Sequence, residues 1–191
     1  SVNTSNLLKA AEEASGEKLD WFFDQWIYSM GHPVFVVTKQ YDAVHKELKI
    51  DVKQTQSINL KDEFPQVKYF NGKVDIEIDG KIEHVWLDAK SENTYTFKLT
   101  DKPKLTNFDY ESTWIKEIQF EKTFDELLYQ FNYSKDILAR QEALNELTNL
   151  GLKEATTSET KIKIKKEFRA VISGTTYWRF RNNVMAQLRK I

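Results

Sequence analysis

The sequence predicts an α+β fold in which an antiparallel β-sandwich is flanked by an N-terminal pair of helices and a C-terminal helical array. Three observations support this prediction. Residues 15–33 carry aromatic side chains at helical spacing, residues 34–120 read as short alternating strands, and residues 121–191 return to helical spacing. We therefore expect a multidomain fragment with parts of three domains, at 1–33, 34–120 and 121–191.

The composition indicates a folded protein without an overall preference for a charged partner. A hydrophobic fraction of 40% and an aromatic fraction of 13% are typical of a chain with a substantial core. The net charge of −1 gives no general attraction to nucleic acid or to a membrane surface. The absence of cysteine excludes disulfides and thiolate metal sites, and leaves the compartment open between cytoplasm and periplasm.

Two helices separated at Gly16 are expected between residues 6 and 31. The second has a broad apolar face that consists of Leu19, Phe22, Phe23, Trp26, Ile27 and Met30. Gly31 suits the left-handed position after the last turn, and Pro33 prevents the helix from resuming. The aromatic stripe of this helix consists of Trp21, Phe22, Phe23 and Trp26. Its helical spacing favours packing against a sheet or another domain over a ligand platform.

The middle of the chain reads as antiparallel strands joined by turns. Residues 48–56 alternate apolar and polar side chains, which is the pattern of a half-buried strand. Asp79-Gly80 lies between two such runs and predicts a hairpin. Residues 94–99 alternate again. Turn residues recur about every eight to twelve positions, which favours a sandwich over a parallel sheet.

The last third of the chain predicts consecutive helices with short connections. Ser134 is the expected N-cap of one helix, with Asp136 near its positive end, and Gly151 is its expected end. A second helix is expected to stop at Gly174. A third is expected to carry Tyr177, Val184 and Leu188, flanked by Trp178 and Met185. This succession is typical of the start of a stacked helical array.

The residues of common catalytic sites are missing from the sequence. The three histidines, His32, His45 and His84, are far from one another and none lies in a His-Glu-x-x-His motif. Both methionines, Met30 and Met185, fall in predicted helices. Because Gly-x-Ser-x-Gly motifs and cysteine nucleophiles are also absent, we expect no catalytic, cofactor-binding or metal-binding residue in this chain.

Paired carboxylates and a Gln-x-Gln sequence have structural and functional interpretations. The pairs are Glu12-Glu13, Asp62-Glu63 and Asp125-Glu126. Adjacent residues do not face each other across a pocket, so a solvated surface is favoured over acid–base chemistry. Gln54 and Gln56 would point to one side of a strand. They either recognise an extended peptide or bond neighbouring loops or a partner domain, and the second interpretation is favoured.

Basic residues gather late in the chain, at Lys161, Lys163, Lys165, Lys166, Arg169, Arg179, Arg181, Arg189 and Lys190. Their interleaving with Tyr177, Trp178 and Phe180 is compatible with a nucleic-acid surface. The favoured interpretation is the outer, solvated face of a helical array, because Lys161, Lys165 and Arg169 lie at fourfold spacing on one helix.

One stretch carries a resemblance to a known family. Residues 15–37, SGEKLDWFFDQWIYSMGHPVFVV, resemble the end of the catalytic domain in the aminopeptidase-N-like zinc metallopeptidases (gluzincins), where a Ser-Gly-x-x-Leu…Phe-Phe-x-x-Trp…Gly-x-Pro pattern leads into a β-sandwich. The segments LKIDVKQTQ, VWLDAK, FDYESTWIKEIQFEK and ILARQEALNEL follow in the order of that family.

The resemblance implies a non-catalytic structural segment of a zinc-dependent aminopeptidase. The parent would hydrolyse N-terminal residues from peptides, and the zinc and its ligands would lie upstream of Ser1. The implied partners are the remaining domains of the parent and its peptide substrate, without a membrane. One alternative is a docking module on an aminopeptidase-like scaffold that has lost its zinc, as in a eukaryotic transcription-initiation subunit. A nucleic-acid-binding module is the weaker alternative. A carbohydrate-binding sandwich using Tyr69, Trp86 and Tyr95 ranks last.

Overall fold

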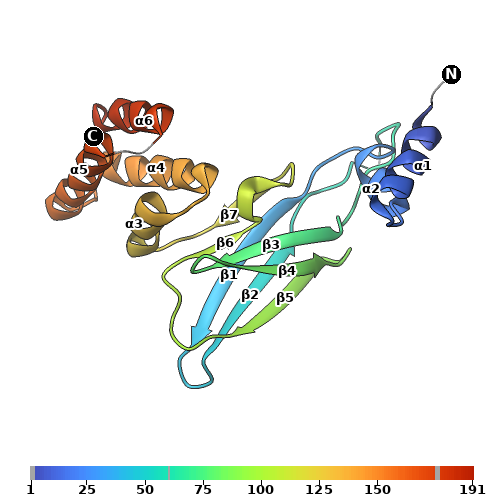
Figure 1. The fold of residues 1–191 in the computed structure, drawn as a ribbon, viewed down its shortest axis with the longest axis horizontal. Coiled ribbons are helices and arrows are strands. Elements are labelled where there is room, and N and C mark those ends of the chain that lie inside the picture. Colours follow the sequence, from blue (N-terminus) through green and yellow to red (C-terminus); the bar gives the residue numbers. More distant parts are fainter. Residues whose placement is uncertain (1–2, 60, 175–176) are drawn as a thin grey trace. The chain divides into compact units, whose positions relative to one another are not determined.

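The computed structural model describes residues 3–59, 61–174 and 177–191. Its elements follow the predicted order, with N-terminal helices, then two largely antiparallel sheets, then a group of C-terminal helices (Figure 1). The predicted α+β class is therefore confirmed. The chain folds into two compact units. Unit 1 contains Ser1–Val74, Val85–Thr100 and Ile115–Phe120, and unit 2 contains Asp75–His84, Asp101–Trp114 and Glu121–Ile191. The division into three domains stays a prediction, because it concerns the parent protein.

In unit 1, the two N-terminal helices separate at the predicted glycine. Helix α1 (Thr4–Ser15) begins with a reciprocal capping box between Asn3 and Asn6. It ends at Gly16, whose φ of 71° is left-handed and favours glycine. Helix α2 (Asp20–Trp26) follows after a short connection.

Helix α2 is shorter than the apolar pattern predicts. Met30 forms a parallel bridge with Gln66 instead of a further helical turn. Its N–H donates to the Pro65 carbonyl at 2.8 Å, and its carbonyl accepts from the Val67 N–H at 3.3 Å. Ile27 and Met30 are 49% and 47% exposed, so they are not part of the packed face of α2. The bridge to a distant segment replaces the local helical bonds.

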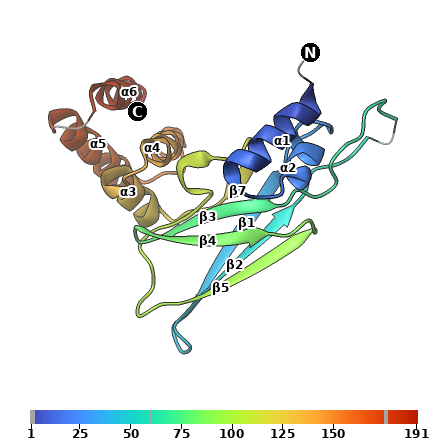
Figure 2. The same cartoon turned by 45° about the vertical axis from the view of Figure 1, so that its right-hand side comes forward.

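Unit 1 contains a four-stranded sheet in the order β5-β2-β1-β7 (Figure 2). Its strands are β1 (Val34–Asp42), β2 (Glu47–Gln54), β5 (Glu92–Lys98) and β7 (Glu117–Phe120). All neighbours are antiparallel except β1 and β7. The alternation predicted for β2 is confirmed, because Leu48, Ile50 and Val52 are at most 1% exposed while Lys49 and Asp51 between them are less buried.

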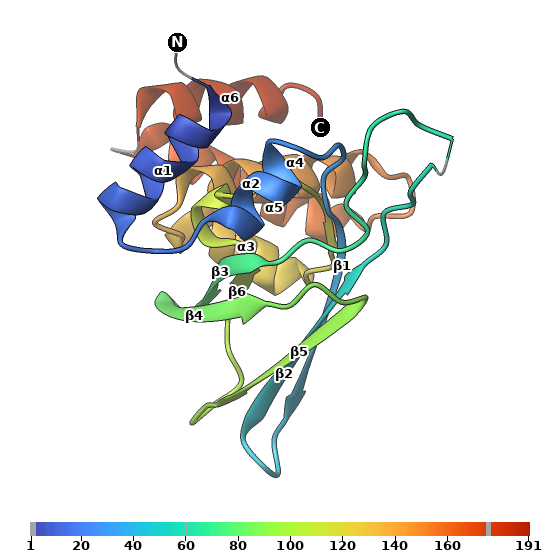
Figure 3. The same ribbon diagram turned by 90° about the vertical axis from the view of Figure 1, so that its right-hand side faces the viewer.

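A second, three-stranded sheet has the order β4-β3-β6. It comprises β3 (Gly72–Ile78), β4 (Lys81–Leu87) and β6 (Thr106–Phe108). Asp79 and Gly80 have φ values of 50° and 84°, as the predicted hairpin between β3 and β4 requires. Figure 3 shows this hairpin, and also β2 and β5 running side by side. The boundary between the two units crosses the hairpin.

The C-terminal helices of unit 2 share one apolar core. They are α3 (Phe124–Tyr133), α4 (Ile137–Leu152), α5 (Ser158–Ser173) and α6 (Trp178–Leu188). In this core the ring of Phe131 on α3 lies 5.1 Å from that of Phe168 on α5 and 5.8 Å from that of Phe180 on α6. Helix α5 stops at Gly174 as predicted.

Three predictions for these helices are corrected by the structure. Ser134 closes α3, whereas Asp136 is the N-cap of α4 and accepts from the Leu138 N–H at 2.8 Å. Helix α4 continues through Gly151, where a Cβ atom would lie 2.9 Å from Cγ2 of Ile191. Tyr177, which was expected in the core, is 52% exposed, and Phe180 is buried there instead. A side chain that packs across helices cannot be told from its exposed neighbour by local spacing alone.

Helix α3 was not predicted as an element of its own. Its signal is the capping box at Thr123 and Glu126, in which each side chain accepts from the backbone N–H of the other residue. A short 3-10 turn, η1 (Tyr110–Ser112), also lies between β6 and β7. Asp109, Glu111 and Ser112 all have positive φ there, and the Asp109 carboxylate holds the turn by accepting from Thr113 and Trp114.

Candidate functional site

The histidines each pair with one carboxylate. His32 Nε2 lies 2.9 Å from Glu117 Oε1, and His45 Nδ1 lies 2.6 Å from Asp42 Oδ2. His84 Nδ1 lies 2.6 Å from Asp75 Oδ1. Within the described residues, no group of three or more His, Asp, Glu or Cys side chains is arranged to hold a metal ion. That the chain lacks catalytic and metal-binding residues stays a prediction.

The pair in the β1–β2 hairpin predicts a pH dependence. The hydrogen bond from His45 lowers the pKa of Asp42 to about 2, and the same bond raises the pKa of His45. The His45 contribution to hairpin stability is fully present below its ordinary pKa of 6.5, and is lost as pH rises through the raised pKa. The Asp42 contribution is present above 3.8 and is lost as pH falls toward about 2.

We therefore expect an NMR titration to place the pKa of His45 above 6.5. The matched variant is Asp42→Asn, which keeps an oxygen to accept from the Val44 and His45 N–H groups but removes the charge. In this variant the pKa of His45 should return toward about 6.5. The same pKa in both proteins would show that the carboxylate has no effect on the imidazole.

The paired carboxylates serve local structure. Glu12 accepts from Lys18 Nζ at 2.9 Å and from the Leu19 N–H at 3.0 Å, and the hydrogen bond from Lys18 lowers its pKa. Glu126 belongs to the capping box of α3, while its neighbour Asp125 lies 3.6 Å from Lys163. The Asp125 side chain is 88% exposed, as the solvated-surface interpretation expects, whereas the Glu12 side chain is only 18% exposed.

The Gln-x-Gln sequence at the end of β2 forms a polar cluster in unit 1. Gln54 is 5% exposed, and its side-chain amide bonds both backbone polar groups of Phe70. Its Oε1 accepts from the Phe70 N–H at 2.8 Å, and its Nε2 donates to the Phe70 carbonyl at 2.8 Å. Gln56 donates to Gln54 Oε1 and to the Lys68 carbonyl. The interpretation that these amides bond a neighbouring loop is confirmed.

A third glutamine completes the cluster and was not predicted. Gln25 of α2 is 5% exposed, donates to the Asn71 carbonyl at 2.7 Å and accepts from the Asn71 N–H at 3.0 Å. The amides of Gln25 and Gln54 therefore act as a strand would, because each pairs with both polar groups of one backbone residue. We call Gln25, Gln54 and Gln56 the glutamine clamp. It fastens residues 68–71 to α2 and β2, and it leaves little amide capacity for a peptide ligand.

The aromatic stripe packs mainly within unit 1. Trp26 lies 4.9 Å from the buried Phe70 ring, and Trp21 meets Trp86 of β4 edge-on at 5.1 Å. Phe23 is 4% exposed, whereas Phe22 remains 40% exposed. The Tyr95 hydroxyl donates to the Trp86 carbonyl, and burial raises its pKa. These contacts support packing rather than a ligand platform or a carbohydrate site.

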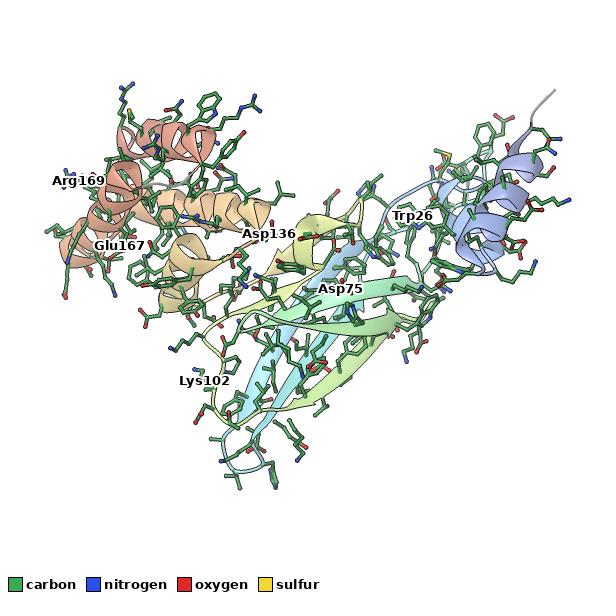
Figure 4. The ribbon with its side chains drawn as sticks, viewed as in Figure 1. Trp26, Asp75, Lys102, Asp136, Glu167 and Arg169 are labelled. Atoms are coloured by element: carbon green, nitrogen blue, oxygen red, sulfur yellow. The ribbon has the colours of Figure 1, made fainter. Side chains whose placement is uncertain are left out.

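Several of the late basic residues are engaged by the protein itself. Arg181 donates to the Gly174 carbonyl at 3.1 Å, Arg179 lies over Trp178 at 5.3 Å, and Lys163 approaches Asp125. Lys166 and Arg169 are exposed on α5, where Arg169 and its neighbour Glu167 are labelled in Figure 4. The nucleic-acid interpretation stays an untested alternative.

Comparison with solved structures identifies the fold. No family model matches the sequence. The chain is similar to a crystal structure of Legionella pneumophila aminopeptidase A in complex with aspartic acid, with a TM-score of 0.74 and 14% sequence identity. The likeness covers 98% of this chain and 22% of the aminopeptidase chain. The chain therefore has the fold of one segment of an aminopeptidase, as the sequence resemblance predicted.

A curated protein is similar over a shorter stretch. Transcription initiation factor TFIID subunit 2 of Schizosaccharomyces pombe is 36% identical over 56 residues, which are 29% of this chain and 5% of that protein. The chain thus corresponds to a small part of either relative. Among the described residues, no helix is both long and apolar enough to cross a membrane.

Proposed function

We propose that the chain is a non-catalytic structural segment of a zinc-dependent aminopeptidase. The observation that carries this proposal is the likeness of fold, which extends over 98% of the chain. The segment would comprise the last helices of a catalytic domain, a β-sandwich and the first helices of a C-terminal domain. The parent would remove residues from peptide N-termini, with its zinc polarising the scissile carbonyl and the attacking water. That zinc would be bound by residues outside this chain.

The work of this segment would be to position the C-terminal helices relative to the active site of the parent. Such a spacer must resist deformation. The glutamine clamp and the Trp26–Phe70 contact supply rigidity in unit 1, because they bind both α2 and β2 to residues 68–71. In unit 2, the shared core of Phe131, Phe168 and Phe180 does the same for the helices.

The isolated chain is therefore expected to lack peptidase activity. Purified protein should bind zinc weakly in a competition titration and should not hydrolyse amino-acid anilides. Each histidine has one carboxylate beside it, whereas a protein zinc site needs three or four ligands. The matched control replaces all three histidines by glutamine and should behave in the same way. Chelator-sensitive turnover that disappears in the triple variant would refute the proposal.

The alternative is a docking module on an aminopeptidase-like scaffold without zinc. The 36% identity to the TFIID subunit over 56 residues supports it. The two candidates require different parent proteins. An aminopeptidase needs two histidines one helical turn apart with a glutamate between them, and a docking module does not. Metal analysis of the purified parent separates them. About one zinc per chain favours the enzyme, and no zinc together with no anilide hydrolysis favours the docking module.

A further inference from the structure

A chain of buried polar groups connects the three-stranded sheet to the helices within unit 2. Glu77 of β3 and Asn107 of β6 are 3% and 4% exposed. The Lys122 side chain, directly before the cap of α3, is also 4% exposed. Asn107 Nδ2 donates to Glu77 Oε2 at 2.7 Å, and Lys122 Nζ donates to Asn107 Oδ1 at 2.7 Å. The amide thus lies between a buried carboxylate and a buried ammonium group.

The chain of contacts continues into α3 and α4. Lys122 Nζ lies 3.3 Å from Glu142 Oε2 of α4. The same oxygen accepts from Gln130 Nε2 of α3 at 3.0 Å, and Gln130 also donates to the Ala139 carbonyl. One ammonium group therefore contacts β6 directly, β3 through Asn107, and both helices through Glu142. We call Glu77, Asn107 and Lys122 the buried relay, and the half-exposed Glu142 lies at its helical end.

The chemistry of the relay favours one orientation of the Asn107 amide. The two ends of the Asn107 amide differ, because its NH2 group can only donate and its oxygen can only accept. The donor end suits the carboxylate and the acceptor end suits the ammonium group. A shift of α3 along the sheet would break the hydrogen bond from Lys122 Nζ to Asn107 Oδ1, so the buried ammonium group would lose one of its partners, which is unfavourable. Burying apolar groups at this place would give no such directional requirement.

A second contact holds α4 at its beginning. Asp136, labelled in Figure 4, caps α4 with Oδ1, and its Oδ2 accepts from the Glu111 N–H of η1 at 3.2 Å. Asp136 is 9% exposed. Helix α3 is thus tied through Lys122 and helix α4 through Asp136 to the segments that precede them.

We propose that Lys122 is a positioning residue that sets the orientation of α3 and α4 relative to β3 and β6. This inference deepens the proposed function and rests on it for its biological meaning, because it names the group through which the spacer would orient the C-terminal helices. It also makes a claim about this chain alone. The claim is that Lys122 fixes one orientation of α3 and α4 relative to β3 and β6. Its effect on the free energy of unfolding is a separate quantity.

Distance measurements by pulsed electron paramagnetic resonance test this claim. The chain has no cysteine, so spin labels attached at Lys81→Cys on β4 and Arg169→Cys on α5 would be the only labels on the protein. Both positions are exposed and lie in unit 2. We expect a single narrow distance peak in this labelled protein. Adding Lys122→Met should widen the peak roughly twofold or create a second one while the helical circular dichroism persists. Adding Lys122→Arg instead should restore one narrow peak.

The control is Lys163→Met, because that side chain is 50% exposed and pairs with Asp125 at 3.6 Å. It should leave the peak width unchanged. If Lys122 only added stability, Lys122→Met would lower the urea midpoint with the same peak width, and the proposal would be overturned. If the Lys122→Met variant does not fold, Glu142→Ala tests the proposal instead, because the Glu142 side chain is half-exposed and contacts Lys122. It should widen the peak to a smaller extent, and an unchanged width would overturn the proposal.

These outcomes are independent of the proposed function. The measurement needs neither zinc nor peptide substrate, so an unchanged width would reject Lys122 while leaving the aminopeptidase proposal standing. Conversely, a parent without zinc would reject the enzyme, and the relay would still orient the helices of a docking module.

Discussion

Replacing Phe131 by alanine is expected to lower the free energy of unfolding of unit 2 by about 4 kcal/mol. Phe131 is 0% exposed, and its ring contacts Phe168 at 5.1 Å and Phe180 at 5.8 Å. The alanine variant removes the ring that three helices share, and the surrounding side chains can fill the cavity only in part. Urea denaturation followed by circular dichroism measures the loss, because most of the helical signal comes from unit 2.

The matched control is Tyr133→Ala on the same helix. Tyr133 is 69% exposed and contacts Tyr129 at 5.0 Å. Its loss is expected to change the free energy of unfolding by about 0.5 kcal/mol. Equal losses in the two variants would mean that the three helices do not depend on one shared core.

The second large effect is expected from Gln54→Leu, which should lower the free energy of unfolding of unit 1 by about 3 kcal/mol. Leucine matches glutamine in size but cannot pair with the Phe70 N–H and carbonyl groups, which Gln54 contacts at 2.8 Å each. Phe70 is 0% exposed, so water does not readily replace the amide. Each buried group left without a partner costs about 1–3 kcal/mol. Urea denaturation followed by tryptophan fluorescence measures the total.

Gln40→Leu is the control for this variant. Gln40 lies on the neighbouring strand β1 at an exposed position. Its replacement is expected to change the free energy of unfolding by less than about 0.5 kcal/mol. Hydrogen exchange locates the effect, because the Phe70 amide should exchange faster in Gln54→Leu and at the original rate in Gln40→Leu. An unchanged Phe70 rate in both would contradict the clamp.

The sequence predicted those elements whose signals are local. The alternation of β2 is visible in Leu48, Ile50 and Val52, and the hairpin is visible in Asp79-Gly80. Gly16 separates α1 from α2 because a left-handed residue is needed where α1 ends. Each of these features depends on side chains or backbone angles within a few residues of the position concerned.

The errors arise where distant contacts compete with local ones. The apolar spacing continues α2 to Met30, but the bridge to Gln66 provides other partners for the Met30 backbone. Ser134 and Asp136 are both suitable caps, and Asp136 is selected because its carboxylate also bonds the Glu111 N–H. Neither competing partner can be found by inspecting the helix alone.

The polar clusters show the same limit. The spacing of Gln54 and Gln56 predicted that they point to one side, and bonding to a neighbouring loop was the favoured interpretation. Phe70 as the partner and Gln25 as the third member were not predicted. The buried relay has no sequence signature, because Glu77, Asn107 and Lys122 come from three separate segments.

Periodicity, turn residues and the order of family-like segments were thus sufficient for the fold class and the element order of this chain. The glutamine clamp, the early end of α2 and the orientation of α3 and α4 arose from long-range contacts. The physical reason is that local patterns specify backbone conformation and the side that is buried. The partner of a buried polar group is set by which distant segment brings a complementary donor or acceptor, because such a group must be paired.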